Sequence, residues 1–170
     1  AAMVLILSAF VSALDASPEF ASVRSSYRSS EQVFLDRLGR PIQERRVSND
    51  VRRLRWTPLA EVSPALIRAV LRSEDKRFYD HSGADWLAVG SAAGNLLSGG
   101  SRRGASTVSM QVAGMLDESL DAPGGGRSFY QKMRQIRAAR QLEDIWSNDQ
   151  ILEDYLNLVS IRGQLHGIQS

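Results

Sequence analysis

The segment SEDKRFYDHSGAD, residues 73–85, carries the adjacent acids Glu74 and Asp75 and is the first candidate for acid–base chemistry. A helix beginning at Pro64 would align on one face Ile67, Leu71, Glu74 and Phe78. A carboxylate on an apolar face is costly unless it is partnered or functional, and burial raises its pKa toward that of a general base. The alternative is a structural glutamate tied to an arginine or a helix terminus, which the spacing alone favours. Asp75 falls on a different face, so the two carboxylates are not automatically a pair.

A second candidate is the glycine-rich stretch GGSRRGASTVSMQ, residues 99–111, which contains Arg102 and Arg103. Such a loop leading into a helix N-terminus is suited to contacting phosphate groups. It lacks the Gly-Lys-Ser/Thr ending of a P-loop, which disfavours nucleotide binding. Thr107 and Gln111 share one polar face of the helix that follows, and Gly114 continues that line. Taken alone, the stretch is more typical of a flexible connector followed by a polar, solvent-facing helix.

The third candidate is the segment FYQKMRQIRAARQLE, in which four cations accompany an apolar stripe. They are Lys132, Arg134, Arg137 and Arg140. A cationic helix can hold a diphosphate or an anionic membrane surface. Nucleic acid is a poor fit, because the net charge of the chain is only +2. The alternative is the ordinary solvated side of a helix.

Composition excludes several other kinds of site. The chain of 170 residues has no cysteine, which excludes disulfide scaffolds, thiolate zinc sites and cysteine nucleophiles. Of its two histidines, His81 has no second histidine nearby, so a hydrogen-bonding role is favoured over a metal ligand. Residues 73–76 fit the S-x-x-K pattern of penicillin-reactive serine enzymes, but neither S-D-N nor K-T-G occurs. A hydrophobic content of 43% with 24% charged residues indicates a globular domain.

The elements that must position these residues are mostly helical. Ser63 and Pro64 predict a helix N-terminus, and Asp85 predicts the cap of a helix running to about residue 98. Ser106 predicts a cap for a helix over residues 107–116, and Ser147 with Gln150 predicts a capping box. Between the last two caps, a helix is expected from a stripe of Phe129, Met133, Ile136, Ala139, Leu142 and Trp146.

Two segments before these helices read as β-structure. The alternation in QVFLDRLGRPIQERR predicts a short hairpin that turns at residues 36–39. Residues 51–56 are a weaker strand candidate. The expected fold class is therefore mainly α with a small β-hairpin near the N-terminal side.

The first fourteen residues, AAMVLILSAFVSAL, carry no charge. They are shorter than the roughly 20 residues that span a bilayer, and three interpretations compete: a signal-peptide core, the outer half of a transmembrane helix, or a buried helix. We favour the second, with residues 1–16 as part of a signal-anchor and residues 17–31, which are polar and serine-rich, as a juxtamembrane linker. Residues 32–170 would then form a module on the outer side of the membrane.

Four motifs in this order resemble those of the family 51 glycosyltransferases, the peptidoglycan glycosyltransferase modules of class A penicillin-binding proteins and their monofunctional relatives. The motifs are Glu74-Asp75-x-x-Phe78-x-x-His81-x-Gly83, Gly104-x-Ser106-Thr107-x-x-x-Gln111, a helix with Lys132, and Ile151-Leu152-Glu153-x-Tyr155-Leu156-Asn157. The details STVSMQVA and MRQIRAARQLE look most like the penicillin-binding protein 1C branch. The resemblance covers about residues 30–168, and it implies a chain cut inside its anchor and short of the last family motif.

The resemblance implies a lysozyme-like helical module with a small membrane-proximal lobe, anchored by one span in a bacterial inner membrane and facing the periplasm. Such modules polymerise lipid II: the 4-hydroxyl of one disaccharide attacks the anomeric carbon of a chain carrying undecaprenyl diphosphate, with inversion. The implied partners are lipid II, the growing glycan strand and other cell-wall synthesis proteins. Relatives often use Mg or Mn, although the sequence shows no metal-ligating cluster.

The resemblance also implies roles for individual residues. Glu74 would be the general base, which reverses the preference that spacing alone gave, and Asp75 would support it. Phe78 and His81 would shape the acceptor cleft, while Thr107 and Gln111 would line the donor side below the loop of Arg102 and Arg103. Lys132 would face the diphosphate. Structural roles fall to Gly83, Ser106, Glu153 and Asn157.

Three positions depart from the family pattern. Gln131 stands where an arginine is usual, and Gln135 stands where the second catalytic acid is usual. Gly114 stands where a lysine or arginine commonly follows the motif-two glutamine. Arg134, or the loop arginines, would have to supply the missing cation. Two rival functions therefore remain: a degenerate module that binds lipid II or cell-wall partners without turnover, and a lysozyme-like lytic enzyme with one essential glutamate.

Overall fold

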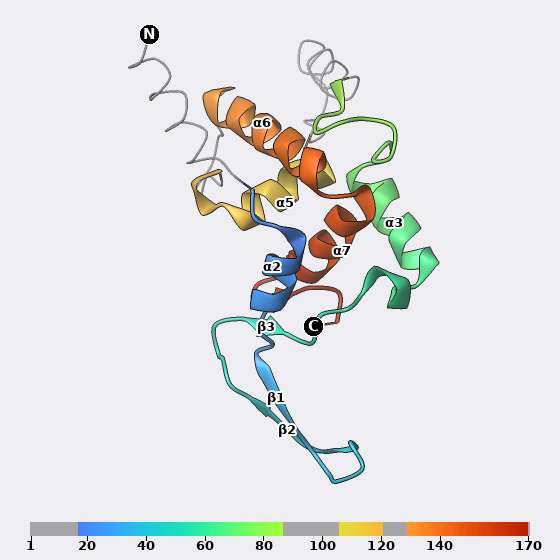
Figure 1. Cartoon of the computed structure of the whole chain (residues 1–170), viewed down its shortest axis with the longest axis vertical. Helices are drawn as coiled ribbons and strands as arrows, with labels where there is room; N and C mark the ends of the chain where they lie inside the picture. The colour runs from blue at the N-terminus through green and yellow to red at the C-terminus, as the bar shows by residue number, and fades with distance from the viewer. Residues whose placement is uncertain (1–16, 87–105, 121–128, 170) are drawn as a thin grey trace.

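The structure is a computed structural model that describes residues 17–86, 106–120 and 129–169. Figure 1 shows a helical body from which one long hairpin extends. Small two- and three-stranded sheets complete the described part. The predicted mainly α fold class is confirmed.

Helix α7 (Asn148–Leu158) lies at the centre of the helical body (Figure 1). It begins at the predicted capping box: the Ser147 side chain accepts the Gln150 N–H, and the Gln150 side chain accepts the Ser147 N–H. Every residue from position 151 to 157 is buried, so both the apolar and the polar sides of this helix face protein. Around it packs a core that includes Phe78, Val108, Val112, Leu142 and Trp146.

Helix α3 (Pro64–Glu74) carries the first candidate residues. Its start is as predicted, because the Ser63 side chain accepts the N–H of Ala65 and Pro64 occupies the first turn, where no partner for its nitrogen is needed. The helix ends at Glu74, because the backbone of Asp75 turns to φ −154°. Ile67, Val70 and Leu71 pack on the core.

Helices α5 (Val108–Leu116) and α6 (Phe129–Ile145) pack against one another, and a short 3-10 turn, η2 (Glu118–Leu120), follows α5. Thr107, not the expected Ser106, caps α5: its backbone is extended, and its side-chain oxygen accepts the Met110 N–H. The predicted stripe of α6 is buried at Ile136, Ala139 and Leu142, whereas Met133 is 41% exposed.

Residues 17–31, expected as a linker, contain helix α2 (Phe20–Ser26) and form part of the packed body. The Phe20 ring makes edge contacts with Trp56 at 6.1 Å and Trp146 at 5.2 Å between ring centroids. The Trp146 indole N–H donates to the carbonyl of Pro18 at 2.9 Å. Contacts with Trp56 and Trp146 thus hold this segment against the helical body, although its polar composition is typical of a linker.

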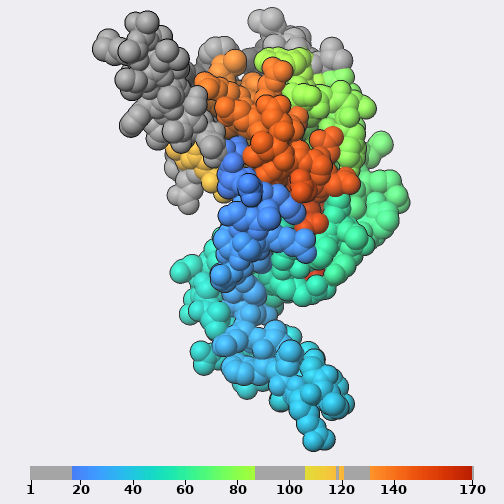
Figure 2. All heavy atoms as spheres, in the orientation of Figure 1, coloured from blue at the N-terminus to red at the C-terminus, as the bar shows by residue number. Residues whose placement is uncertain are grey.

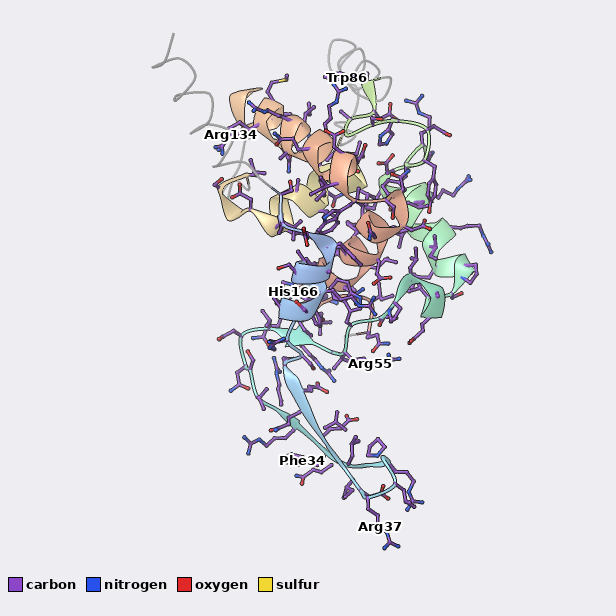
Figure 3. The ribbon with its side chains drawn as sticks, in the orientation of Figure 1. Phe34, Arg37, Arg55, Trp86, Arg134 and His166 are labelled. Carbon is purple, nitrogen blue, oxygen red and sulfur yellow. The ribbon has the colours of Figure 1, made fainter. Side chains whose placement is uncertain are left out.

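The predicted hairpin is confirmed as β1 (Glu31–Leu35) and β2 (Pro41–Arg46), which pair antiparallel. Asp36 closes its turn by accepting the N–H groups of Leu38 and Arg40. The hairpin stands clear of the helices (Figure 2), and Phe34 and Arg37 lie far out along it (Figure 3).

The strand expected over residues 51–56 is shorter, β3 (Arg52–Arg53). It pairs in parallel with β5 (Leu165–His166), which pairs antiparallel with β4 (Ser160–Arg162). A 3-10 turn, η1 (Leu59–Glu61), then leads into α3.

Several expectations lie outside the described residues: the apolar start, the loop with Arg102 and Arg103, and nearly all of the helix expected after Asp85. Within the described ranges, no helix has the length and apolar character needed to cross a bilayer.

Candidate active site

Glu74 is the last residue of α3, and its carboxylate is exposed. One oxygen accepts the Ser73 hydroxyl and the other accepts the Gln111 side-chain N–H from α5, both at 3.2 Å. The exposure differs from the sequence expectation of a carboxylate on a buried face, because α3 ends here and Asp75 turns into the protein instead. A carboxylate that is held in place and open to solvent can reach a bound hydroxyl group.

Tyr155 of α7 lies close enough for the Glu74 charge to affect its pKa. Burial, and in second place the charge of Glu74, raise the pKa of Tyr155 to about 12. The phenol therefore stays neutral. Three helices meet at Glu74: α3 carries it, α5 binds it through Gln111, and α7 lies beside it.

Asp75 is buried and holds the segment after α3 to the start of α5. One of its oxygens accepts the backbone N–H of Val108, the first residue of α5, at 3.1 Å. Its carboxylate also accepts the His81 Nε2–H, at 2.9 and 3.0 Å to its two oxygens. A negative charge at a helix N-terminus is favourable, because the helix dipole is positive there. These contacts hold Asp75, the residue next to Glu74, in place.

Gly83 brings the same segment against α6. Its φ is +66°, and a Cβ there would lie 2.3 Å from Arg140 Cγ and 3.0 Å from Arg140 N, so only glycine fits. Its N–H donates to a Glu143 oxygen at 2.6 Å, and its carbonyl accepts the Thr107 hydroxyl at 2.7 Å. The other Glu143 oxygen accepts the Ser109 hydroxyl.

Glu143 did not emerge from the sequence motifs. The signal that would have found it is its helical spacing: it follows Ile136 by seven residues and Ala139 by four, which places an acid on the packed side of α6.

Two predicted substrate contacts lie in the interior. Phe78 is 1% exposed in the main core, and Thr107 is a buried helix cap. In this structure both side chains are therefore part of the packed interior. Asp85, expected as a helix cap, pairs with Arg77, whose Nε lies 3.0 Å from an Asp85 oxygen.

Glu153 and Asn157 of α7 bind the strand that leads into α3. Glu153 accepts the Trp56 indole N–H and the Leu59 N–H, each at 2.7 Å. Asn157 accepts the Thr57 N–H at 2.7 Å and donates to the Thr57 carbonyl at 2.9 Å. The buried polar side of α7 therefore fixes the approach to the helix that ends in Glu74.

Comparison with known proteins shows which family this chain belongs to. The family model described as Transglycosylase matches residues 39–170. The chain belongs to the transglycosylase family. The family resemblance expected from the sequence is thereby confirmed, while the 1C branch stays a prediction.

Individual members of the transglycosylase family show the same relationship. The biosynthetic peptidoglycan transglycosylase of Agrobacterium fabrum is 38% identical over 116 residues, which are 68% of this chain and 49% of the relative. That of Rhodospirillum centenum is also 38% identical over 116 residues, 68% of this chain and 48% of the relative. Penicillin-binding protein 1A of Neisseria flavescens is 36% identical over 119 residues, 69% of this chain and 14% of the relative. The chain spans about half the length of the biosynthetic transglycosylases it matches.

The cationic side of this transglycosylase chain lies on α6. Lys132 Nζ donates to the Ser106 hydroxyl at 2.7 Å, which ties α6 to the residue before the α5 cap. Arg134, which Figure 3 shows projecting from α6, donates to the Ser119 hydroxyl at 3.3 Å.

Two of the three departures from the family pattern are neighbours in space. Gln135 is 2% exposed, and a Cβ on Gly114 would lie 3.2 Å from its side-chain nitrogen. Within the described part of the chain, the Gln135 side-chain oxygen has no hydrogen-bond partner. Loss of the usual cation and loss of the usual acid therefore concern a single contact between α5 and α6.

The family resemblance suggested Mg or Mn as a divalent cation at the site. No three histidine, aspartate or glutamate side chains among the described residues lie close enough to hold a metal ion.

Proposed function

We propose that this chain is the glycosyltransferase module of a cell-envelope enzyme that joins lipid II disaccharides into peptidoglycan strands. The observation that carries the proposal is Glu74, an exposed carboxylate held by Gln111 where α3 meets α5, in a chain of the transglycosylase family. The names of the relatives, biosynthetic peptidoglycan transglycosylase and penicillin-binding protein 1A, support the same reaction class.

In the proposed reaction, Glu74 accepts the proton of the 4-hydroxyl of one disaccharide. The freed oxygen lone pair forms a bond to the anomeric carbon of the growing chain. The bond from that carbon to the diphosphate oxygen breaks on the opposite face, so the configuration inverts and undecaprenyl diphosphate leaves with the electron pair. A positioned general base typically contributes a factor of about 10² to 10⁴ to such a step.

The charge that develops on the leaving diphosphate needs fixed cations. Lys132 is half-buried and held by Ser106, and Arg134 projects from the same helix. We assign both to the diphosphate side, with Arg102 and Arg103 as further contacts. Removing one such preorganised group typically costs about 3 kcal/mol of transition-state stabilisation.

We further propose that the uncharged first residues belong to a single membrane anchor. An anchor of this kind would keep the site near the bilayer surface, where a substrate with an undecaprenyl chain must arrive. The module would then act on the periplasmic side of the inner membrane.

A second candidate function is a module that binds lipid II or a cell-wall partner without turnover. The neutral pair of Gly114 and Gln135 favours it, because that contact holds neither the cation nor the second acid of the family pattern.

The test is polymerisation of fluorescent lipid II by the whole protein in detergent, with products separated by chain length. Strands should form with the native protein and fall by at least about 10²-fold with Glu74→Gln. Glu44→Gln, an exposed glutamate on the distant hairpin, is the matched control and should not change the rate. Lipid II binding without strands would support the second candidate, and shortening of preformed glycan would point to a lytic enzyme.

A further inference from the structure

Glu143 of α6 joins three parts of the protein through one carboxylate. One oxygen accepts the Gly83 N–H at 2.6 Å, and the other accepts the Ser109 hydroxyl of α5. The segment of residues 75–85, helix α5 and helix α6 therefore converge on this side chain.

The segment of residues 75–85 is the direct continuation of Glu74. At the beginning of this segment, the Asp75 carboxylate accepts the N–H of Val108 at the N-terminus of α5. At its end, the Gly83 carbonyl accepts the Thr107 hydroxyl, and the Gly83 N–H donates to Glu143. Both ends of the segment are therefore bound at the start of α5, the helix that also carries Gln111, the partner of Glu74.

We propose that Glu143 is a positioning residue for the transferase reaction: by clamping Gly83 and Ser109 it sets the register between the Glu74 segment and Gln111. The inference rests on the proposed function. No motif assigned a role to this residue, and it does not touch Glu74 itself.

The two groups that bind Glu143 differ in what they can do. The Gly83 N–H can only donate, so it needs an acceptor oxygen, whereas the Ser109 hydroxyl can either donate or accept. A glutamine of the same shape can turn its amide oxygen toward Gly83 and its NH₂ group toward the Ser109 oxygen. Glu143→Gln therefore preserves both contacts, whereas Glu143→Leu, of similar volume, removes both.

This difference permits a rescue experiment. Glu143→Leu should lower kcat about tenfold or more with KM for lipid II unchanged, because small displacements of a catalytic group are expensive. Glu143→Gln should keep kcat close to the native value. Ser109→Ala, which leaves the contact with Gly83 in place, should lower kcat by less than Glu143→Leu. Asp144→Asn, an exposed acid next in sequence, is the matched control.

The measurements are kcat and KM of the whole protein on fluorescent lipid II well below its melting temperature, with the Gly83 amide proton followed by NMR. The amide resonance should lie downfield in the native protein and in Glu143→Gln, and move upfield in Glu143→Leu. An unchanged kcat in Glu143→Leu, or a Glu143→Gln variant as slow as Glu143→Leu, would overturn the inference while the proposed function stands. Absence of polymer from the native protein would instead overturn the proposed function, and this inference with it.

Discussion

Asp154, in the middle of the central helix α7, gives the sharpest stability prediction. Its side chain is 0% exposed, and neither carboxylate oxygen has a hydrogen-bond partner among the described residues. Burial, and in second place the neighbouring Glu153 charge, raise the pKa of Asp154 to about 7. The folded protein therefore holds a proton that the unfolded chain releases near pH 4.

The sign of the pH dependence follows from this proton. Between about pH 4 and pH 7 the folded state binds one more proton than the unfolded state, so the free energy of unfolding falls as pH rises, and it levels off above about pH 7. A difference of about three pH units corresponds to about 4 kcal/mol at most. Asp154→Leu should remove this slope. At low pH it should be about 1–3 kcal/mol more stable than the native chain, because an unpartnered buried polar group is lost, and this gain should grow as pH rises to about 7, where the native chain has lost its proton-linked stability.

The assay is urea denaturation of the native chain, Asp154→Leu and Asp154→Asn at pH 5, 6, 7 and 8. Asp154→Asn should also abolish the slope, whereas Asp144→Asn on the exposed side of α6 should retain it. A native protein equally stable at pH 5 and pH 8, or a slope that persists in both Asp154 variants, would refute the reasoning.

Two further predictions concern glycines. Gly83→Ala should lower the free energy of unfolding by about 3 kcal/mol or more, because it combines positive-φ strain with a clash against Arg140. Gly163→Ala, at φ +56° with nothing within 4 Å, should lower it by only about 1 kcal/mol in the same thermal melts. Equal losses of stability in the two variants would contradict the close approach of Gly83 to Arg140. Gly114→Ala should leave the free energy of unfolding nearly unchanged when Gln135 is present. In a Gln135→Ala background it should raise that free energy by about 1 kcal/mol, because the alanine methyl has room and alanine has the higher helix propensity. A double-mutant cycle that shows no coupling would contradict the contact between Gly114 and Gln135.

Local chemistry made some elements predictable from the sequence. The caps at Ser63 and Ser147 involve residues within three positions of one another, and the hairpin turn is closed by Asp36 alone. Such contacts are encoded in neighbouring residues, and they were confirmed. The cap of α5 was missed by one residue, because Ser106 and Thr107 are both good caps and tertiary contacts select Thr107.

Features set by tertiary packing were not predictable in the same way. Helix α2 has the composition of a linker, and it is held by the Phe20 ring between two tryptophans distant in sequence. Periodicity placed Glu74 on a buried face because it assumed that the helix continues to Phe78, whereas the helix ends at Glu74 itself. Glu143 acquires its partners only when α5, α6 and the segment of Gly83 come together.

The parallel pairing of β3 with β5 has a consequence for how the chain is made. Arg52 and Arg53 find their strand partners only at Leu165 and His166, and Thr57 finds its partner only at Asn157. During synthesis, the backbone of Arg53 can pair with Ser30 early, but the pairing of β3 with β5 and the contact of Thr57 with Asn157 must wait until residues 157–166 have left the ribosome. Contacts of such long sequence separation slow folding, because loop closure is paid for before they form. Growth from the N-terminus thus cannot complete the support of Glu74 until residues 157–166 have been made.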